Sequence, residues 1–113
     1  MKLPNGDAAI VEDAKLLEYA LNPHHPVGRW HARLFDLLLG IPPANYTVLK
    51  EALLRAAREL DVVPGKLTLF GRKYEMRVPM AGPRGMKVVL AVWLIETGDD
   101  RPRLITCYVE KPS

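Results

Sequence analysis

The chain has 113 residues, of which 49% are hydrophobic and 26% charged, and its formal net charge is +3. These values favour one folded domain over residues 1–113 and exclude an intrinsically disordered chain. Because there is one cysteine, no run of about 18 apolar residues and no apolar stretch at the start, we exclude an intramolecular disulfide and expect a cytoplasmic protein with no membrane partner.

Three helices are predicted in the first half of the chain. The first covers about residues 12–21 and stops at Asn22-Pro23, since the residue before proline avoids the helical region. The second covers about 27–39 and ends at Gly40, and the third covers about 45–60. The residues predicted to be buried recur at helical spacing: Leu16, Leu17, Ala20 and Leu21; Val27, Trp30, Leu34, Leu37 and Leu38; and Tyr46, Leu49, Leu53, Ala56, Ala57 and Leu60.

The hydrophobic period falls to that of a strand after Pro64-Gly65. Residues 73–80 alternate apolar and polar, residues 86–95 are apolar on both faces, and residues 104–109 form the last predicted strand. Residues 82–85 predict a turn, and residues 67–70 a short extra strand. Helices over about 12–60 followed by strands over about 67–109 predict an α+β fold. Its helices should pack on one face of an antiparallel sheet of three to four strands.

Charge is divided unequally between the two halves. Residues 1–61 carry 7 Lys/Arg and 8 Asp/Glu, a net charge of −1, whereas residues 62–113 carry 9 and 5, a net charge of +4. A positive half is compatible with an anionic partner such as RNA, although ordinary domains show it too.

Histidine 31 is the first candidate for chemistry. It follows Val27 by about one turn and precedes Leu34 by about one turn, so its imidazole should lie on or beside the buried side of the second helix. Imidazole exchanges a proton near neutral pH, which suits an acid–base catalyst. A core-edge histidine with one hydrogen bond explains the same position.

The last predicted strand supplies two hydroxyl groups. Two-residue periodicity places Leu104, Thr106 and Tyr108 on one face, where the threonine and tyrosine hydroxyls can donate to a phosphate or orient a nucleophile. Both residue types are also simply common in strands.

Metal and cofactor sites have little support. His24, His25 and His31 lie within eight positions, but no Cys or Asp completes a known ligand spacing. No phosphate-binding loop or nucleophile motif is present, and we expect Cys107 to be a buried thiol. We therefore expect no metal and no cofactor.

Several segments together resemble a bacterial family of short domains of unknown function, found alone or at the C-termini of polymorphic toxins and phage-head-like proteins. The matching segments are KLLEYALNP (15–23), HPVGRWHARLF (25–35), LGI (39–41), GRKY (71–74), GPRG (82–85), WLI (93–95) and PRLITCYV (102–109). The resemblance covers about residues 3–109. That family is itself similar to the barnase–EndoU–colicin–RelE-like group of ribonuclease folds.

The resemblance implies toxin-type RNA cleavage without a metal. Carried over by position, it implies catalytic roles for His31, Thr106 and Tyr108 and substrate-binding roles for Lys15 and Tyr74. The family usually has lysine at the position of His31, so this residue departs from the pattern. Lys15 suits stabilisation of phosphate charge, and it also suits an ordinary solvated helix position.

Two functions remain open on the sequence. One is an endoribonuclease that works by acid–base transesterification on RNA. The other is a non-catalytic module that keeps the fold and binds RNA or a protein, such as an inhibitor or another partner.

Overall fold

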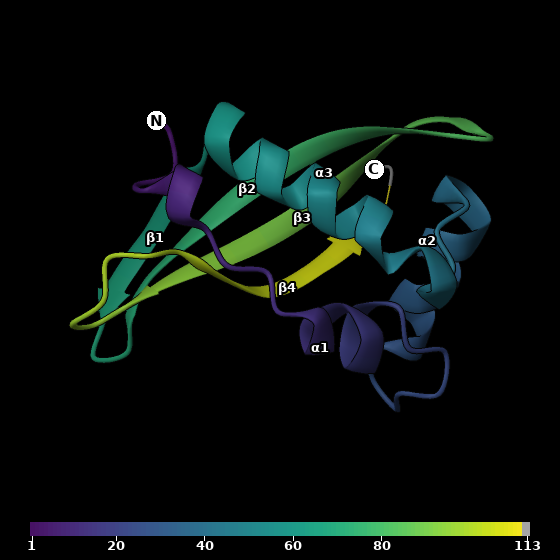
Figure 1. Cartoon of the computed structure of the whole chain (residues 1–113), viewed down its shortest axis with the longest axis horizontal. Helices are drawn as coiled ribbons and strands as arrows, with labels where there is room; N and C mark the ends of the chain where they lie inside the picture. Colours follow the sequence, from purple (N-terminus) through teal and green to yellow (C-terminus); the bar gives the residue numbers. More distant parts are fainter. Residues whose placement is uncertain (112–113) are drawn as a thin grey trace.

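The computed structural model describes residues 1–111 and shows helices followed by an antiparallel sheet, which confirms the predicted α+β fold (Figure 1). The helical elements are η1 (Gly6–Ala8), α1 (Asp13–Lys15), the π-helical turn η2 (Leu16–Ala20), α2 (Arg29–Leu39), η3 (Pro43–Asn45) and α3 (Tyr46–Glu59). The strands are β1 (Val63–Thr68), β2 (Gly71–Gly82), β3 (Gly85–Glu96) and β4 (Arg103–Val109). Within residues 1–111, no helix is long and apolar enough to cross a membrane.

The four strands pair in chain order, β1-β2-β3-β4, and every pairing is antiparallel. β2 and β3 form the longest hairpin, closed by the predicted turn between Gly82 and Gly85. The extra strand predicted at 67–70 is β1, but it begins earlier, at Val63, and the chain turns at Phe70. Pro64 lies inside this strand because β1 is at the edge of the sheet, where one missing N–H donor is tolerated.

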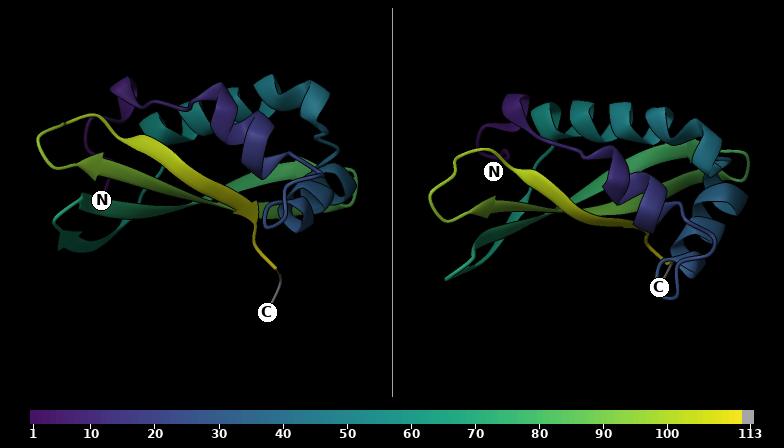
Figure 2. Two further views of the ribbon diagram at one scale, coloured as in Figure 1. Left: turned by 90° about the horizontal axis from the view of Figure 1, so that it is seen from below. Right: turned by 60° about the horizontal axis from the view of Figure 1, so that its bottom comes forward.

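One face of the sheet is covered by helices, and we call it the helix face (Figure 2). Its side chains form the core together with the helices: Tyr74, Met76, Val78, Val89, Ala91, Trp93, Leu104, Cys107 and Val109. The opposite surface, here the open face, carries the alternate residues of the same strands: Lys73, Glu75, Arg77, Leu90, Val92, Thr106 and Tyr108. The two faces therefore present different chemistry.

A bulge in β4 changes the predicted facing of its residues. Val92 pairs with Thr106, but the next residue of β3, Trp93, pairs with Leu104. The extra residue on β4 turns Leu104 into the core and leaves Thr106 and Tyr108 on the open face. The prediction that all three share one face is wrong, because strict alternation stops at a bulge.

The first helix is shorter and less regular than predicted. It begins at Asp13, and its second half is a π-helical turn in which the Leu21 N–H donates to the Leu16 carbonyl. The wider turn lets Leu16 and Leu21 both enter the core, whereas Leu17 has 39% of its surface exposed. The prediction that Leu17 is buried is therefore wrong.

The second helix buries the predicted side only in part, since Leu34 and Leu38 pack against the edge of the core. Its buried residues are Ala32, Phe35 and Leu39, whereas Val27, Trp30 and Leu37 are exposed and Leu34 and Leu38 are half-buried. Leucine and phenylalanine occupy five of the six positions from 34 to 39, so helical spacing alone does not select one side. Packing against the end of the sheet selects the side that carries Phe35.

The third helix matches its prediction closely. Leu49, Leu53, Ala56 and Ala57 are buried, and Tyr46 and Leu60 pack at the edge of the same core. The helix packs over the helix face of the sheet (Figures 1 and 2).

The burial of α2 gives a direct test of its orientation. Phe35 has 0% and Leu37 has 52% of its surface exposed. Phe35→Ala should lower the free energy of unfolding by about 3–5 kcal/mol, because it leaves a cavity in the core. Leu37→Ala should change it by less than about 0.5 kcal/mol. Urea unfolding of both variants measures the difference, and equal losses would contradict the observed packing.

Candidate functional site

The His31 side chain meets Tyr108 where α2 packs against the end of β4. The two rings are stacked, with centroids 5.0 Å apart and planes inclined by 27°. Both side chains are half-buried, so each has one side against the protein and another open to solvent. The contact joins a group that can exchange a proton to a phenol, at a point that a ligand can reach.

Thr106 extends this site along β4. It precedes Tyr108 by two residues, so both side chains point to the open face, where they pair across from Val92 and Leu90 of β3. Thr106 is also half-buried. We call His31, Thr106 and Tyr108 the seam, since His31 of α2 meets Tyr108 and Thr106 lies on the same face of β4.

Position and charge together disfavour the protonated form of His31. Partial burial, and then the positive charge of Lys111, lower the pKa of His31 below its ordinary value of 6.5. At neutral pH the ring is therefore a neutral imidazole, which can accept a proton.

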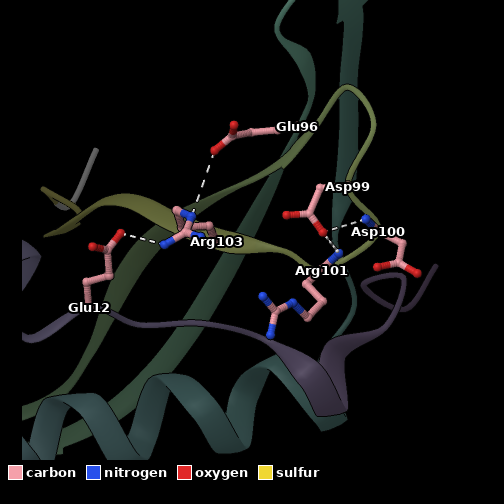
Figure 3. A network of polar contacts seen from close by, with 6 residues as sticks. All are labelled: Glu12, Glu96, Asp99, Asp100, Arg101 and Arg103. Carbon is pink, nitrogen blue, oxygen red and sulfur yellow. Dashed lines mark hydrogen bonds and ion pairs between the residues drawn. The ribbon is translucent and has the colours of Figure 1, made fainter.

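Two arginines near the open face are already paired with carboxylates. Arg77 donates to both carboxylate oxygens of Glu110, at 2.9–3.2 Å, and Arg103 donates to Glu12 at 2.7 Å. Figure 3 shows Arg103 between Glu12 and Glu96, and beside it Asp99, which accepts backbone N–H donors. Each of these two arginines is neutralised locally, and their carboxylate partners raise the pKa of both.

The structure does not bring Tyr74 to the seam. Tyr74 pairs with Trp93 on the helix face and is almost completely buried, whereas Thr106 and Tyr108 lie on the open face. The sheet itself separates these side chains. A role for Tyr74 in binding substrate at the seam therefore lacks geometric support.

Lys15 is the last residue of α1 and is half-buried. No hydrogen bond or ion pair among residues 1–111 joins it to His31, Thr106 or Tyr108. Its substrate-binding role stays a prediction.

The other two histidines have separate surroundings. The Nδ1 atom of His25 accepts the N–H groups of Val27 and Gly28, at 3.0 and 2.9 Å, and its ring packs edge-on against Tyr19. His25 thus satisfies backbone donors ahead of α2, while His24 is exposed. No group of three His, Cys, Asp or Glu suited to a metal occurs within the described part of the chain, residues 1–111.

Gly28 lets the backbone before α2 approach the backbone of η2 closely. A Cβ at this position would lie 2.5 Å from the Tyr19 carbonyl oxygen. The glycine lets the start of α2 pack directly on the end of η2, which sets where His31 emerges.

Sequence reasoning missed two charged residues at the seam. Continued alternation from Tyr108 would have placed Glu110 on the open face, beside Arg77. Lys111 follows the end of β4, and no periodic signal in the sequence connects it with His31.

Cys107 is completely buried on the helix face, as predicted. Burial raises the pKa of its thiol to about 12, so the reactive thiolate is absent at neutral pH. Cys107 is therefore part of the core.

The pKa of His31 can be tested by titration. We expect an NMR titration of the ring to have its midpoint below 6.5, and Lys111→Gln to move it upward, because a like charge is removed. The unfolded chain then binds the proton more tightly than the folded one. The contribution of His31 to stability is therefore complete above about pH 6.5 and is lost as the pH falls through the pKa of folded His31. A midpoint above 6.5 would contradict this description.

Comparisons with known proteins agree with this fold. One chain of a contact-dependent growth inhibition toxin–immunity protein complex from Klebsiella pneumoniae 342 superimposes with a TM-score of 0.70 at 16% identity, over 90% of this chain and all of that chain. At this identity the similarity establishes the fold alone. No curated protein matches the sequence. The model of a domain of unknown function, DUF6883, matches residues 2–111, and the protein therefore belongs to the DUF6883 family.

Proposed function

We propose that this protein cleaves RNA by acid–base transesterification without a metal, at the seam between α2 and β4. The observation that carries the proposal is the stacked pair of His31 and Tyr108, with Thr106 on the same strand face. The similarity to a chain of a toxin–immunity complex supports a toxin-type activity. For a toxin-type activity on cellular RNA, the proposed site of action is the cytoplasm.

Each seam residue has a role in the proposed reaction. Neutral His31 removes the proton of the 2′-hydroxyl, whose oxygen attacks the neighbouring phosphorus. The bond from phosphorus to the 5′-oxygen then breaks, and the Tyr108 hydroxyl gives that oxygen a proton, which His31 later restores to Tyr108. Thr106 donates a hydrogen bond to the phosphate, and Lys111 supplies a positive charge beside it. The products are a 2′,3′-cyclic phosphate and a free 5′-hydroxyl.

The test uses purified protein and single-stranded RNA in EDTA. We expect cleavage by the wild type and a loss of about 10²- to 10⁴-fold in kcat/KM for His31→Ala, the usual contribution of a general base. Tyr108→Phe keeps the stacked ring and removes only the hydroxyl, so it separates chemistry from packing. The rate should also rise with pH, with an apparent pKa below 6.5.

His24→Ala is the matched control, because His24 is exposed in the loop before α2. It should leave the rate unchanged. Absence of cleavage by the wild type, or equal rates for the wild type and His31→Ala, would refute the proposed activity.

A second candidate function is binding of a protein partner through the β1–β2 hairpin. Its tip carries Leu69 and Phe70, with 93% and 80% of their surfaces exposed, beside exposed Leu67 of β1. Lys66, Arg72 and Lys73 belong to this hairpin. The acidic residues Glu96 and Asp99 line the same hollow as Leu67 and Arg72, so the charge beside the tip is mixed. Exposed apolar groups at a hairpin tip suit a protein partner, and the similarity to a chain of a toxin–immunity complex supports such a partner.

Substitution at the tip tests this second function. Leu69→Ser combined with Phe70→Ser should leave the free energy of unfolding within about 0.5 kcal/mol of the wild type, since both side chains lie in solvent. It should abolish a stoichiometric complex with a protein partner, measured by size-exclusion chromatography with mass determination. His31→Ala is the control and should keep the complex. A complex that survives the double substitution would exclude the hairpin as its interface.

A further inference from the structure

The two tryptophans of this chain have opposite environments. Trp93 is fully buried on the helix face, whereas Trp30, on α2, has 58% of its surface exposed. Trp30 lines a hollow of about 260 Å³ together with Pro23, Arg29 and Arg33. A large aromatic ring in solvent, in a hollow edged by two arginines, is unusual for a surface with only a structural role.

The positive charge at this hollow is not neutralised. The Arg29 guanidinium lies 5.3 Å from the centroid of the Trp30 ring, and Arg33 follows Arg29 by one helical turn. Within residues 1–111, neither arginine forms an ion pair, in contrast to Arg77 and Arg103. No acidic residue occurs between positions 18 and 36. An anion can therefore approach without displacing a carboxylate.

An exposed aromatic ring beside free guanidinium groups fits a nucleotide of single-stranded RNA. The base stacks on the indole, and the guanidinium groups donate paired hydrogen bonds to phosphate. We propose that Trp30, Arg29 and Arg33 form a nucleotide-binding subsite for the RNA strand that reaches the seam. This inference rests on the proposed function, and it adds a contact to a base, which none of the proposed seam residues supplies.

The position of the subsite on α2 connects it to the seam. Trp30 and His31 are consecutive residues, so their side chains leave the helix about 100° apart. The ring of His31 turns toward Tyr108 of β4, while Trp30 lines the hollow beside Pro23. The proposed subsite and His31 thus occupy consecutive positions near the start of α2, and the proposed RNA strand runs from one to the other.

Fluorescence makes the subsite directly observable. Because Trp93 is buried, Trp30 is the one tryptophan of this chain that a ligand can contact from solution. The probe is a hexamer of 2′-O-methyl uridine, which lacks the 2′-hydroxyl proton and so cannot be cleaved by the proposed reaction. We expect saturable quenching of the Trp30 emission. Inorganic polyphosphate, which has no bases, should quench much less at the same charge concentration.

Variants separate stacking from charge. With a labelled hexamer followed by anisotropy, Trp30→Ala should weaken binding by about 5- to 150-fold, the loss of one stacked base. Arg29→Gln and Arg33→Gln should each reduce the slope of log K against log salt by about 0.7, the value for one phosphate contact in a single strand. Leu37→Ala, an exposed apolar change on the same helix, should leave binding unchanged.

The outcomes distinguish this subsite from the catalytic proposal. Quenching with no cleavage by the wild type keeps the subsite and refutes the ribonuclease. Cleavage with equal hexamer binding by the wild type and Trp30→Ala keeps the ribonuclease and refutes the subsite. Equal quenching by polyphosphate would also overturn the subsite, because the surface would then recognise charge alone. A loss of affinity in Leu37→Ala as large as in Trp30→Ala would overturn it too, because the surface would then bind a broad apolar partner such as a protein.

Discussion

Phe35 anchors α2 to the core, and the position of the candidate site depends on this contact. Its side chain is completely buried, whereas the helix leaves Trp30 and Leu37 in solvent. Gly82 supports the same packing from the sheet, because a Cβ there would lie 2.1 Å from the Leu38 carbonyl oxygen. A rotation of α2 that buried Trp30 would withdraw Phe35 from the core and carry His31 away from Tyr108. One packing choice thus sets both the seam and the proposed subsite.

Ion pairs with carboxylates cancel the charge of some basic residues and leave others available to an anion. The sheet half has a net charge of +4, which suggests that an anionic ligand would meet the sheet. However, Arg77 and Arg103 already bind carboxylates, so their charges are locally cancelled. The helix that carries His31, in the half with net charge −1, holds two arginines without an ion pair among the described residues. Pairing therefore leaves Arg29 and Arg33 available to an anion, as it also leaves basic residues of the sheet half such as Lys66 and Lys73.

A single extra residue in β4 decides which side chains face the seam. Without the bulge between Leu104 and Thr106, Leu104 would lie on the open face and the core would lose a buried leucine. With it, the strand places Leu104 in the core and still presents Thr106 and Tyr108 on the open face, where Tyr108 meets His31 of α2. Thr106 and Tyr108 share one face, as the sequence predicts, whereas Leu104 lies on the opposite face.

The sequence by itself determined the order of helices and strands, the whole of α3, the alternation of β2 and the turn between Gly82 and Gly85. These features follow from local backbone geometry, since the periods of 3.6 and 2 residues can be recognised within one segment. Only the tertiary structure decided that α2 buries Phe35, that Tyr74 and Tyr108 lie on opposite faces, and that His31 stacks on Tyr108. Such relations depend on the register and packing of segments far apart in the chain, which no local period encodes.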